Sequence, residues 1–326
     1  MTLLRACGRV AGRVAGWVLL VAMLAVLANR LHGGSALLVQ VQAQALTGLL
    51  LLPAPLLLAL AWWRGRRALA VAAVVPSLAL AVWALDAAGL SRGEPAGDPL
   101  LRVATANLAL DNPRVEDAAA ALLAEDPQVV VLQEVTPGLW SRLATTPLAR
   151  ALPHHVVDAR EGYHGSAVLS ATPVTGEVRA LGHGDVLETR VDVGGTTAPT
   201  TPTSLLLVDV HVPAPVPANG TGPWSAHLAE LEATYAARPG VLLAGDFNAT
   251  ADHAALRQVL DGGLRDAWDE AGRGLGGTFP HRGALPSVLR LDHVLVGSGL
   301  VATEARTVDL PGSDHRALVA DVGRAP

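Results

Sequence analysis

The sequence predicts an α/β sandwich with mixed sheets, preceded by three transmembrane helices. Long apolar runs fill most of the first 90 residues. From Leu100 onward, short runs rich in β-branched residues alternate with segments of helical periodicity, a pattern typical of an α/β domain. The strand patterns outnumber the helical ones, which favours mixed sheets over purely parallel sheets.

The apolar runs cover residues 16–28, 45–63 and 68–85, and the last two approach the ~20 residues that a bilayer-spanning helix needs. Pro53, Pro55 and Pro76 lie within them and are tolerated in membrane spans when neighbouring helices satisfy the freed backbone groups. We therefore expect a membrane domain over residues 1–90 with three spans. A buried helical hairpin in a soluble protein is the alternative, and runs this long and uncharged disfavour it.

Arginines flank the apolar runs at two places, before the first run and between the second and third: Arg5, Arg9, Arg13, Arg64, Arg66 and Arg67. Basic flanking residues stay on the cytoplasmic side, so three spans place the rest of the chain outside the cell membrane. A cleaved signal peptide ending near Ala28 is the alternative for the first run, and it also leaves the later domain outside.

Residues 91–99 are polar and rich in Gly and Pro, which predicts a short linker. Residues 100–326 are enough for one sizeable domain. The first 99 residues hold 8 of the 24 basic residues and 3 of the 29 acidic ones, so the domain carries 16 basic against 26 acidic side chains. This acidic balance argues against tight, nonspecific binding to nucleic acid.

Within the domain, strand patterns occur at residues 101–106, 129–132, 167–170, 186–193, 205–211, 241–244, 291–296 and 317–322. Helical patterns occur at residues 114–124, 223–237 and 253–260. The only cysteine is Cys7, so the domain has no disulfide and no thiolate metal site. Five histidines lack the spacing of a zinc site and are expected in solvated loops: His154, His155, His183, His253 and His281.

Polar side chains stand at the ends of several strand patterns, as they do where a rigid scaffold carries a site. These residues are Asn107, Glu134, His211, Asp246 and Asp292. Asn248 follows Asp246 by two residues, so both side chains would share one face of an extended strand. Gly245 before them permits a close approach of the backbone. The alternative is an ordinary turn, because Gly-Asp-x-Asn is also common turn chemistry.

Asp314 and His315 are adjacent, and on a regular strand they would point to opposite faces. To serve one site they must precede the strand, which we therefore expect to begin near Ala317. Ser313 does not complete a serine-hydrolase triad, because three consecutive side chains cannot align as nucleophile, base and orienting group, and the chain has no Gly-x-Ser-x-Gly elbow.

The sequence contains three specific motifs in the order "LQEV", "GDFN" and "SDHR", and the weaker motifs "ATANL", "GSAVLS", "VHV" and "RLDHV". By these motifs and their order, it resembles the endonuclease/exonuclease/phosphatase superfamily of metal-dependent phosphoesterases. The resemblance covers essentially residues 101–322. It implies a four-layer α/β sandwich, in which two packed mixed β-sheets are flanked by helices.

The same resemblance implies that Glu134 is the principal ligand of Mg²⁺, with Asn107 and Asp314 as further ligands or partners of the ligands. Mn²⁺ is the alternative ion. Oxygen ligands in an incomplete protein cage suit Mg²⁺, which keeps waters and recruits substrate phosphate. Tyr163, in "EGYHGSAVLS", stands where some members place a tyrosine that contacts phosphate.

By the same resemblance, His211 and Asn248 donate hydrogen bonds to phosphate oxygens, and Asp246 orients or deprotonates the attacking water. His315 completes the catalytic set and is held in its tautomer by Asp292, which requires adjacent strands.

The sequence thus predicts a membrane-anchored, Mg²⁺-dependent phosphoesterase with an extracytoplasmic catalytic domain. The expected substrate is a phosphate ester at the membrane surface, such as a phospholipid or a polyprenyl pyrophosphate. An extracellular nuclease is one alternative, although the acidic balance makes nucleic acid a less favoured partner. A non-catalytic membrane sensor or scaffold is the other, and the chain retains every expected catalytic residue. The oligomeric state stays open.

Overall fold

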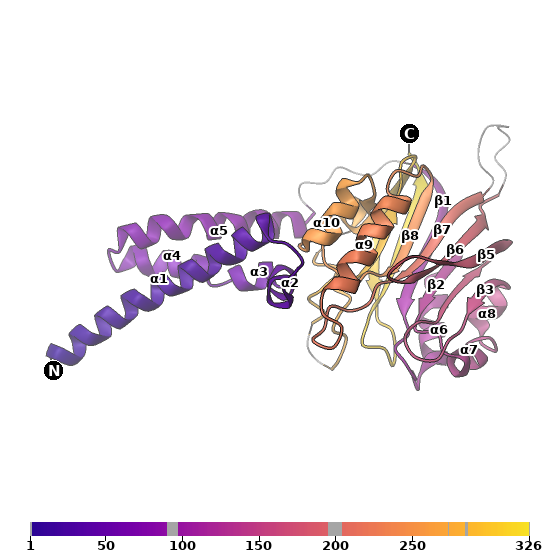
Figure 1. The fold of residues 1–326 in the computed structure, drawn as a ribbon, viewed down its shortest axis with the longest axis horizontal. Helices are drawn as coiled ribbons and strands as arrows, with labels where there is room; N and C mark the ends of the chain where they lie inside the picture. Colours follow the sequence, from indigo (N-terminus) through magenta and orange to yellow (C-terminus); the bar gives the residue numbers. More distant parts are fainter. Residues whose placement is uncertain (1, 90–96, 195–203, 273, 284–285, 326) are drawn as a thin grey trace.

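The computed structural model describes residues 2–89, 97–194, 204–272, 274–283 and 286–325. The predicted linker over residues 91–99 falls largely outside these described residues. Its last two positions belong to the first strand, β1 (Asp98–Asn107), which begins earlier than the sequence pattern indicates. A helical bundle precedes this strand and extends away from a layered α/β domain (Figure 1).

The bundle contains α1 (Thr2–His32), α2 (Leu38–Ala45), α3 (Thr47–Leu51), α4 (Ala54–Trp63) and α5 (Arg67–Ala87). Two helices, Val10–His32 and Arg67–Ala87, are long and apolar enough to cross a membrane. The middle run is broken: Leu38–Ala45 and Thr47–Trp63 meet at a bend of 75°, and they make a third span only if counted together. We expected three continuous spans. The described residues contain two continuous candidate spans, and a third only if the two bent helices count as one broken span.

The α/β domain contains two mixed sheets of six strands each. Sheet A has the order β11-β12-β1-β2-β4-β3, and sheet B has the order β5-β6-β7-β8-β10-β9. In sheet A the pair β1–β2 is parallel, and in sheet B the pair β7–β8 is parallel, whereas the other pairs are antiparallel. The strands not yet given bounds are β2 (Val129–Gln133), β3 (His154–Asp158), β4 (Ser166–Ser170), β5 (Val174–Ala180), β6 (Asp185–Asp192), β7 (Ser204–His211), β8 (Val241–Asp246), β9 (Arg265–Asp266), β10 (Asp292–Val296), β11 (Leu300–Val308) and β12 (Ala317–Arg324).

The two sheets pack face to face, and helices cover their outer faces, which gives the predicted four layers (Figure 1). Alternate residues of each central strand serve the two faces: Val103 lies between the sheets and Ala104 faces the helices. Sheet A is covered by α6 (Val115–Leu123), α7 (Pro137–Leu143) and α8 (Pro147–Ala151). Sheet B is covered by α9 (Gly222–Tyr235) and α10 (Ala254–Asp261), and the short α11 (Ala267–Ala271) follows β9.

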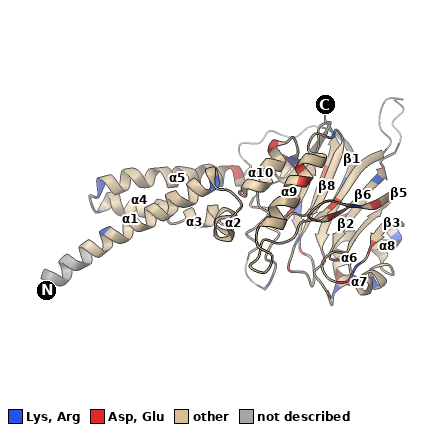
Figure 2. Ribbon diagram, viewed as in Figure 1, with Lys and Arg blue, Asp and Glu red and all other residues tan. Residues whose placement is uncertain are grey.

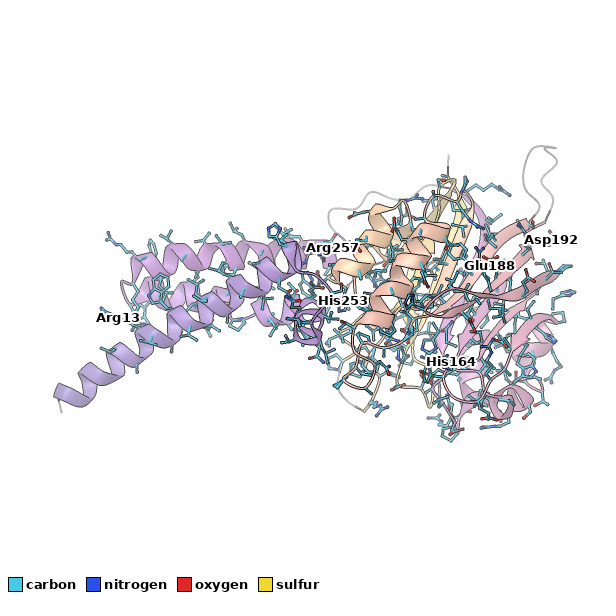
Figure 3. The ribbon with its side chains drawn as sticks, in the orientation of Figure 1. Arg13, His164, Glu188, Asp192, His253 and Arg257 are labelled. Carbon is cyan, nitrogen blue, oxygen red and sulfur yellow. The ribbon has the colours of Figure 1, made fainter. Side chains whose placement is uncertain are left out.

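The helical bundle packs against the α/β domain next to α10. Figure 3 shows His253 and Arg257 at this junction, while Arg13 lies near the opposite end of the bundle. Nε2 of His253 lies 3.0 Å from the backbone oxygen of Val41, and Arg30 forms an ion pair of 2.6 Å with Asp252. Val41 also belongs to the apolar core under α9 and α10. Packed, hydrogen-bonded contacts therefore join the bundle to the domain.

Candidate active site

The candidate site lies at one end of the sandwich, where the two sheets meet. In sheet B, Asp246 ends β8 and is in register with His211 on β7 and Asp292 on β10. In sheet A, Asn107 ends β1, Glu134 follows β2, and Asp314 and His315 precede β12. The prediction that this last strand begins near Ala317 is confirmed, since β12 starts there.

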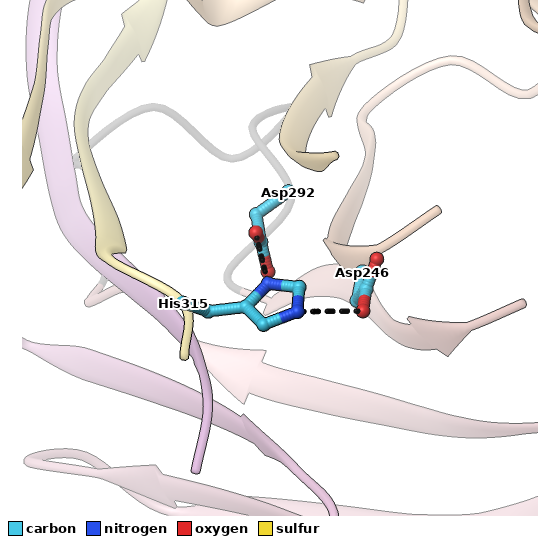
Figure 4. A group of neighbouring side chains, drawn as sticks. All are labelled: Asp246, Asp292 and His315. Carbon is cyan, nitrogen blue, oxygen red and sulfur yellow. Dashed lines mark hydrogen bonds and ion pairs between the residues drawn. The ribbon is translucent and has the colours of Figure 1, made fainter. Parts of the chain in front are cut away.

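Asp246, His315 and Asp292 form a buried cluster across the two sheets (Figure 4). Nδ1 of His315 donates a hydrogen bond to Oδ2 of Asp292 at 2.8 Å. Nε2 of the same ring faces Oδ2 of Asp246 at 3.8 Å. The bond to Asp292 fixes the orientation of the ring and leaves Nε2 directed at Asp246, as the sequence interpretation requires.

Burial and neighbouring charges shift the pKa values of this cluster. Burial by itself lowers the pKa of His315, but the carboxylates of Asp292 and Asp246 outweigh burial and raise this pKa to about 10. Burial also raises the pKa of Asp246, with a further contribution from Asp292, while the two histidines beside Asp246 oppose the rise. The positive ring of His315 therefore lies between two carboxylates.

Asn107 links the carboxylates of the two sheets. Its Nδ2 donates to Oε1 of Glu134 at 3.0 Å and to Oδ2 of Asp246 at 3.2 Å. The second oxygen of Glu134 accepts the backbone N–H of Leu110 at 2.7 Å. Asn107 directs its amide nitrogen at both carboxylates, so in this arrangement it positions acidic groups.

The turn after β8 brings Asn248 beside Asp246. Oδ1 of Asp246 accepts the backbone N–H of Asn248 at 2.8 Å, and Nδ2 of Asn248 donates to the backbone oxygen of Val212 at 2.9 Å. The segment is thus a turn that also carries two site residues. Gly245 is required before it, because a Cβ there would lie 1.9 Å from the backbone oxygen of Val210 on the neighbouring strand.

His211 is oriented by the loop that carries Tyr163. Nδ1 of His211 donates to the backbone oxygen of Tyr163 at 2.9 Å, since a carbonyl can only accept. Nε2 of His211 lies 3.8 Å from Oδ2 of Asp246. The side chain of Tyr163 is exposed, and its ring approaches the imidazole of His211 edge-on.

These residues surround an open cavity of about 480 Å³. Eight of the nine predicted site residues line it: Asn107, Glu134, Tyr163, His211, Asp246, Asn248, Asp314 and His315. The ninth, Asp292, lies behind His315. The sequence interpretation did not single out Asn219 or Arg282, which also line the cavity, and Arg282 pairs with Asp314 at 2.8 Å. Both lie in loops without a periodic signal.

Backbone strain is concentrated around the cavity. Ala109, Glu134 and Asn248 all adopt positive φ angles, of 59°, 60° and 47°, and all three line the cavity. Such conformations are rare for residues other than glycine and persist where the surrounding structure determines them, often at functional sites. Three of the five such residues in the described part of the chain therefore lie at the cavity, and the other two are Asp111 and Asp126.

A divalent cation fits this set of donors. Glu134, Asp246 and Asp314 line the cavity, and three or more carboxylates at one place are stabilised by a hard cation. Asp246, Asp292 and His315 also lie close enough together to hold an ion. Within that group, Asp292 and His315 are already hydrogen-bonded to each other.

Polar contacts beneath the cavity hold the two sheets in register. Nε2 of Gln133 on β2 donates to Oδ1 of Asp209 on β7 at 2.7 Å. Ser313 donates to the backbone oxygen of Asn107 at 2.7 Å and accepts the backbone N–H of His315 at 2.9 Å. Its buried hydroxyl thus makes hydrogen bonds within the fold, which agrees with the prediction that Ser313 does not belong to a serine-hydrolase triad.

The prediction of solvated loop positions is wrong for three of the histidines. His154 and His155 are exposed, but they lie on the strand β3. His253 is not a solvated loop residue, because its side chain is buried at the junction with the helical bundle. Its Nδ1 accepts the backbone N–H of Thr250 at 2.7 Å, and its ring packs edge-on against that of Trp224. The sequence pattern could not show this, because the partners of His253 come from the bundle and from α9.

The site geometry agrees with a sequence comparison. The family model described as Endonuclease/Exonuclease/phosphatase family matches residues 104–315. The chain belongs to this family. Its members are phosphoesterases, so this endonuclease/exonuclease/phosphatase protein is a hydrolase of phosphate ester bonds with a buried Asp246–Asp292–His315 cluster. No curated protein matches the chain at a significant level.

Solved structures share the fold of this chain. An endonuclease/exonuclease/phosphatase from Beutenbergia cavernae is 23% identical, with a TM-score of 0.54 over 69% of this chain and 72% of its own. A mannosyl-6-phosphatase from Bacteroides thetaiotaomicron is 15% identical, with a TM-score of 0.53 over 68% and 99%. A 3′ phosphatase from Neisseria, bound to a product DNA hairpin, is 20% identical, with a TM-score of 0.51 over 68% and 98%.

Proposed function

We propose that the protein is a membrane-anchored, Mg²⁺-dependent phosphoesterase that acts on a phosphate ester at the extracytoplasmic surface of the membrane. The observation that carries the catalytic part is the buried Asp246–His315–Asp292 cluster, which opens into a cavity lined by Glu134 and Asp314. A sensor or scaffold that only bound a ligand would not need an acid, a base and a metal-binding carboxylate in one cavity.

Glu134 and Asp314 would hold the cation, and Asn107 would position Glu134. When bound, Mg²⁺ supplies positive charge that stabilises the negative charge developing on the phosphate oxygens. Mn²⁺ would serve the same carboxylates, because oxygen ligands suit both ions.

The protein side chains then position the reactants. Asp246 lies between the Nε2 atoms of His211 and His315, at 3.8 Å from each, and its carboxylate orients the attacking water. The water oxygen bonds to phosphorus while the ester P–O bond breaks. The Asp246–His315 pair takes one proton from the water and returns one to the leaving oxygen, which keeps the electron pair of the broken P–O bond. His211 and Asn248 contact the phosphate oxygens.

The orientation in the membrane is supported by the basic residues of the bundle. Arg66 donates from Nη1 to the backbone oxygen of Gly12 at 2.8 Å, so the α4–α5 turn lies beside the segment that carries Arg13. Figure 3 shows Arg13 near the end of the bundle that points away from the α/β domain, and Figure 2 shows that basic residues, in blue, gather at this end. Because basic flanks favour the cytoplasm, the catalytic domain lies on the opposite side.

Catalysis is tested with the full chain in nanodiscs and bis-p-nitrophenyl phosphate as the substrate. We expect turnover with Mg²⁺, loss with EDTA, and recovery when Mg²⁺ is restored. Glu134→Ala should lower kcat/KM at least 100-fold and weaken Mg²⁺ binding measured by calorimetry, a readout that does not depend on turnover. Glu177→Ala, on an exposed position of β5, is the matched control. Normal activity of Glu134→Ala would refute the assignment.

The substrate is tested with a panel of lysophospholipid, undecaprenyl pyrophosphate and single-stranded DNA. We expect hydrolysis of a lipid phosphate. Turnover of DNA alone would instead favour the extracellular nuclease, and no turnover of any compound would favour the sensor or scaffold.

Orientation is tested separately by labelling. In a Cys7→Ser background, which contains no other cysteine, Glu177→Cys should react with a membrane-impermeant maleimide in intact cells. Labelling only after lysis would place the catalytic domain in the cytoplasm.

A further inference from the structure

Large apolar side chains are exposed at four positions in the described part of the α/β domain: Leu110, Tyr163, Val216 and Leu275. Single exposed apolar residues are common on protein surfaces. Three of the four are not scattered, because Leu110 and Tyr163 line the catalytic cavity, and Val216 lies in the loop between two further lining residues, Ala214 and Asn219.

The three residues near the cavity come from three separate loops. Leu110 follows β1, Tyr163 lies between β3 and β4, and Val216 follows β7. Their relative exposures are 42%, 44% and 40%, so each keeps a large part of its apolar surface in water. Apolar groups gathered from separate loops at the mouth of one cavity indicate a binding function.

The cavity changes in character from its mouth to its floor. Its floor holds charged groups, including Glu134 and Asp246. Phe279 also lines the cavity and extends the apolar surface inward, since its ring centroid lies 5.0 Å from that of His315. A ligand that matches this arrangement carries a phosphate at one end and a hydrocarbon group next to it.

We propose that Leu110, Tyr163 and Val216 form an apolar rim that binds the hydrocarbon chain of the substrate, so that the substrate class is a phosphate ester bearing an acyl or polyprenyl chain. The proposal rests on the proposed phosphoesterase function and names the substrate class of the same site. The acidic balance of the domain supports it against nucleic acid, whose backbone would be repelled.

The test compares two phosphodiesters that release the same p-nitrophenolate, dodecyl p-nitrophenyl phosphate and ethyl p-nitrophenyl phosphate. The readout is the chain-length preference, defined as kcat/KM for the dodecyl ester divided by kcat/KM for the ethyl ester. The full chain in nanodiscs is used throughout. Partitioning of the dodecyl ester into the bilayer is the same for every variant, so it cancels when preferences are compared.

We expect the wild type to prefer the dodecyl ester. A Leu110→Ser/Val216→Ser variant should lower the preference roughly tenfold or more, mainly through KM, because two apolar contacts with the chain are lost. The substitutions change only side chains, so the backbone N–H of Leu110 that holds Glu134 remains. Leu275→Ser is the matched control, since this leucine is equally exposed, at 42%, but lies outside the cavity.

A double variant that retains the wild-type preference would overturn the proposal, as would a wild type without any preference. An equal loss in Leu275→Ser would show a nonspecific effect of surface polarity and would also overturn it. If the wild type hydrolyses neither ester with Mg²⁺, the proposed function itself is wrong, which is a separate result. Circular dichroism confirms that each variant is folded.

Discussion

The buried carboxyl group of Asp209 gives the protein a pH-dependent stability that one substitution should remove. Asp209 is 1% exposed and accepts a hydrogen bond from Gln133 at 2.7 Å, across the two sheets and beneath the cavity. Burial raises its pKa from 3.8 to about 7, and the hydrogen bond from Gln133 only partly opposes this rise. The folded protein therefore keeps a proton that the unfolded chain releases.

The sign and size of the effect follow from this shift. Because the folded-state pKa of Asp209 is raised, its contribution to the free energy of unfolding is complete below pH 4 and is lost as the pH rises through 7. A shift from 3.8 to about 7 corresponds to about 4 kcal/mol. About 3 kcal/mol of this is lost between pH 5 and pH 8, which for a domain of this size is roughly 10 °C in Tm.

The assay is thermal unfolding of the full chain in detergent micelles, followed by tryptophan fluorescence at pH 5, 6, 7 and 8. Asp209→Asn keeps an acceptor for Gln133 and cannot titrate. The Tm of the wild type should therefore fall relative to the Tm of this variant as the pH rises. Asp309→Asn, at a side chain 73% exposed, is the control and should differ from the wild type by a small, constant amount. The reasoning is refuted if Asp209→Asn also differs by a constant amount at every pH.

Three further substitutions test other contacts. Gly245→Ala should lower stability by about 3 kcal/mol or more, measured as a fall in Tm, because its Cβ would meet the backbone oxygen of Val210 at 1.9 Å. Tyr163→Phe should lower kcat/KM about tenfold without changing Tm, since it removes one hydroxyl but keeps the carbonyl that orients His211; an unchanged kcat/KM would remove the hydroxyl from the mechanism. His253→Ala should speed hydrogen exchange in α2 and α10, and unchanged exchange would contradict its role at the junction.

The sequence predicted the central strands of both sheets and missed the edge strands. A central strand contacts a helical layer on one face and the other sheet on the second, so β2 and β8 are buried throughout and polar only at their last residues, Gln133 and Asp246. The missed strands β3, β5, β9 and β11 are the four edges of the two sheets. β5, for example, is largely exposed. Most of its side chains face water, and it pairs with only one neighbouring strand. Its sequence therefore shows no apolar pattern.

The candidate site was predictable where it depended on strand ends and unpredictable where it depended on contacts between distant segments. Asn107, His211 and Asp246 each terminate an apolar strand, which the sequence displays directly. The pairing of Gln133 with Asp209 joins the two sheets across 76 residues of chain. A polar residue inside the run "LLLVDVHV" was a visible signal for Asp209, but nothing in the run identified its partner.

The junction with the helical bundle bears on the site as well as on attachment. The backbone oxygen of Asn248 accepts a hydrogen bond from Trp224 at 3.0 Å, and Trp224 packs on His253, which contacts Val41 of the bundle. The bundle is therefore linked, through His253 and Trp224, to the turn that follows β8 and carries Asn248. An anchor that only kept the domain near the membrane would need no such contact. If the substrate is a membrane lipid, these contacts hold the cavity at one fixed position relative to the apolar helices of the bundle, so that the hydrocarbon chain and the phosphate can be bound at the same time.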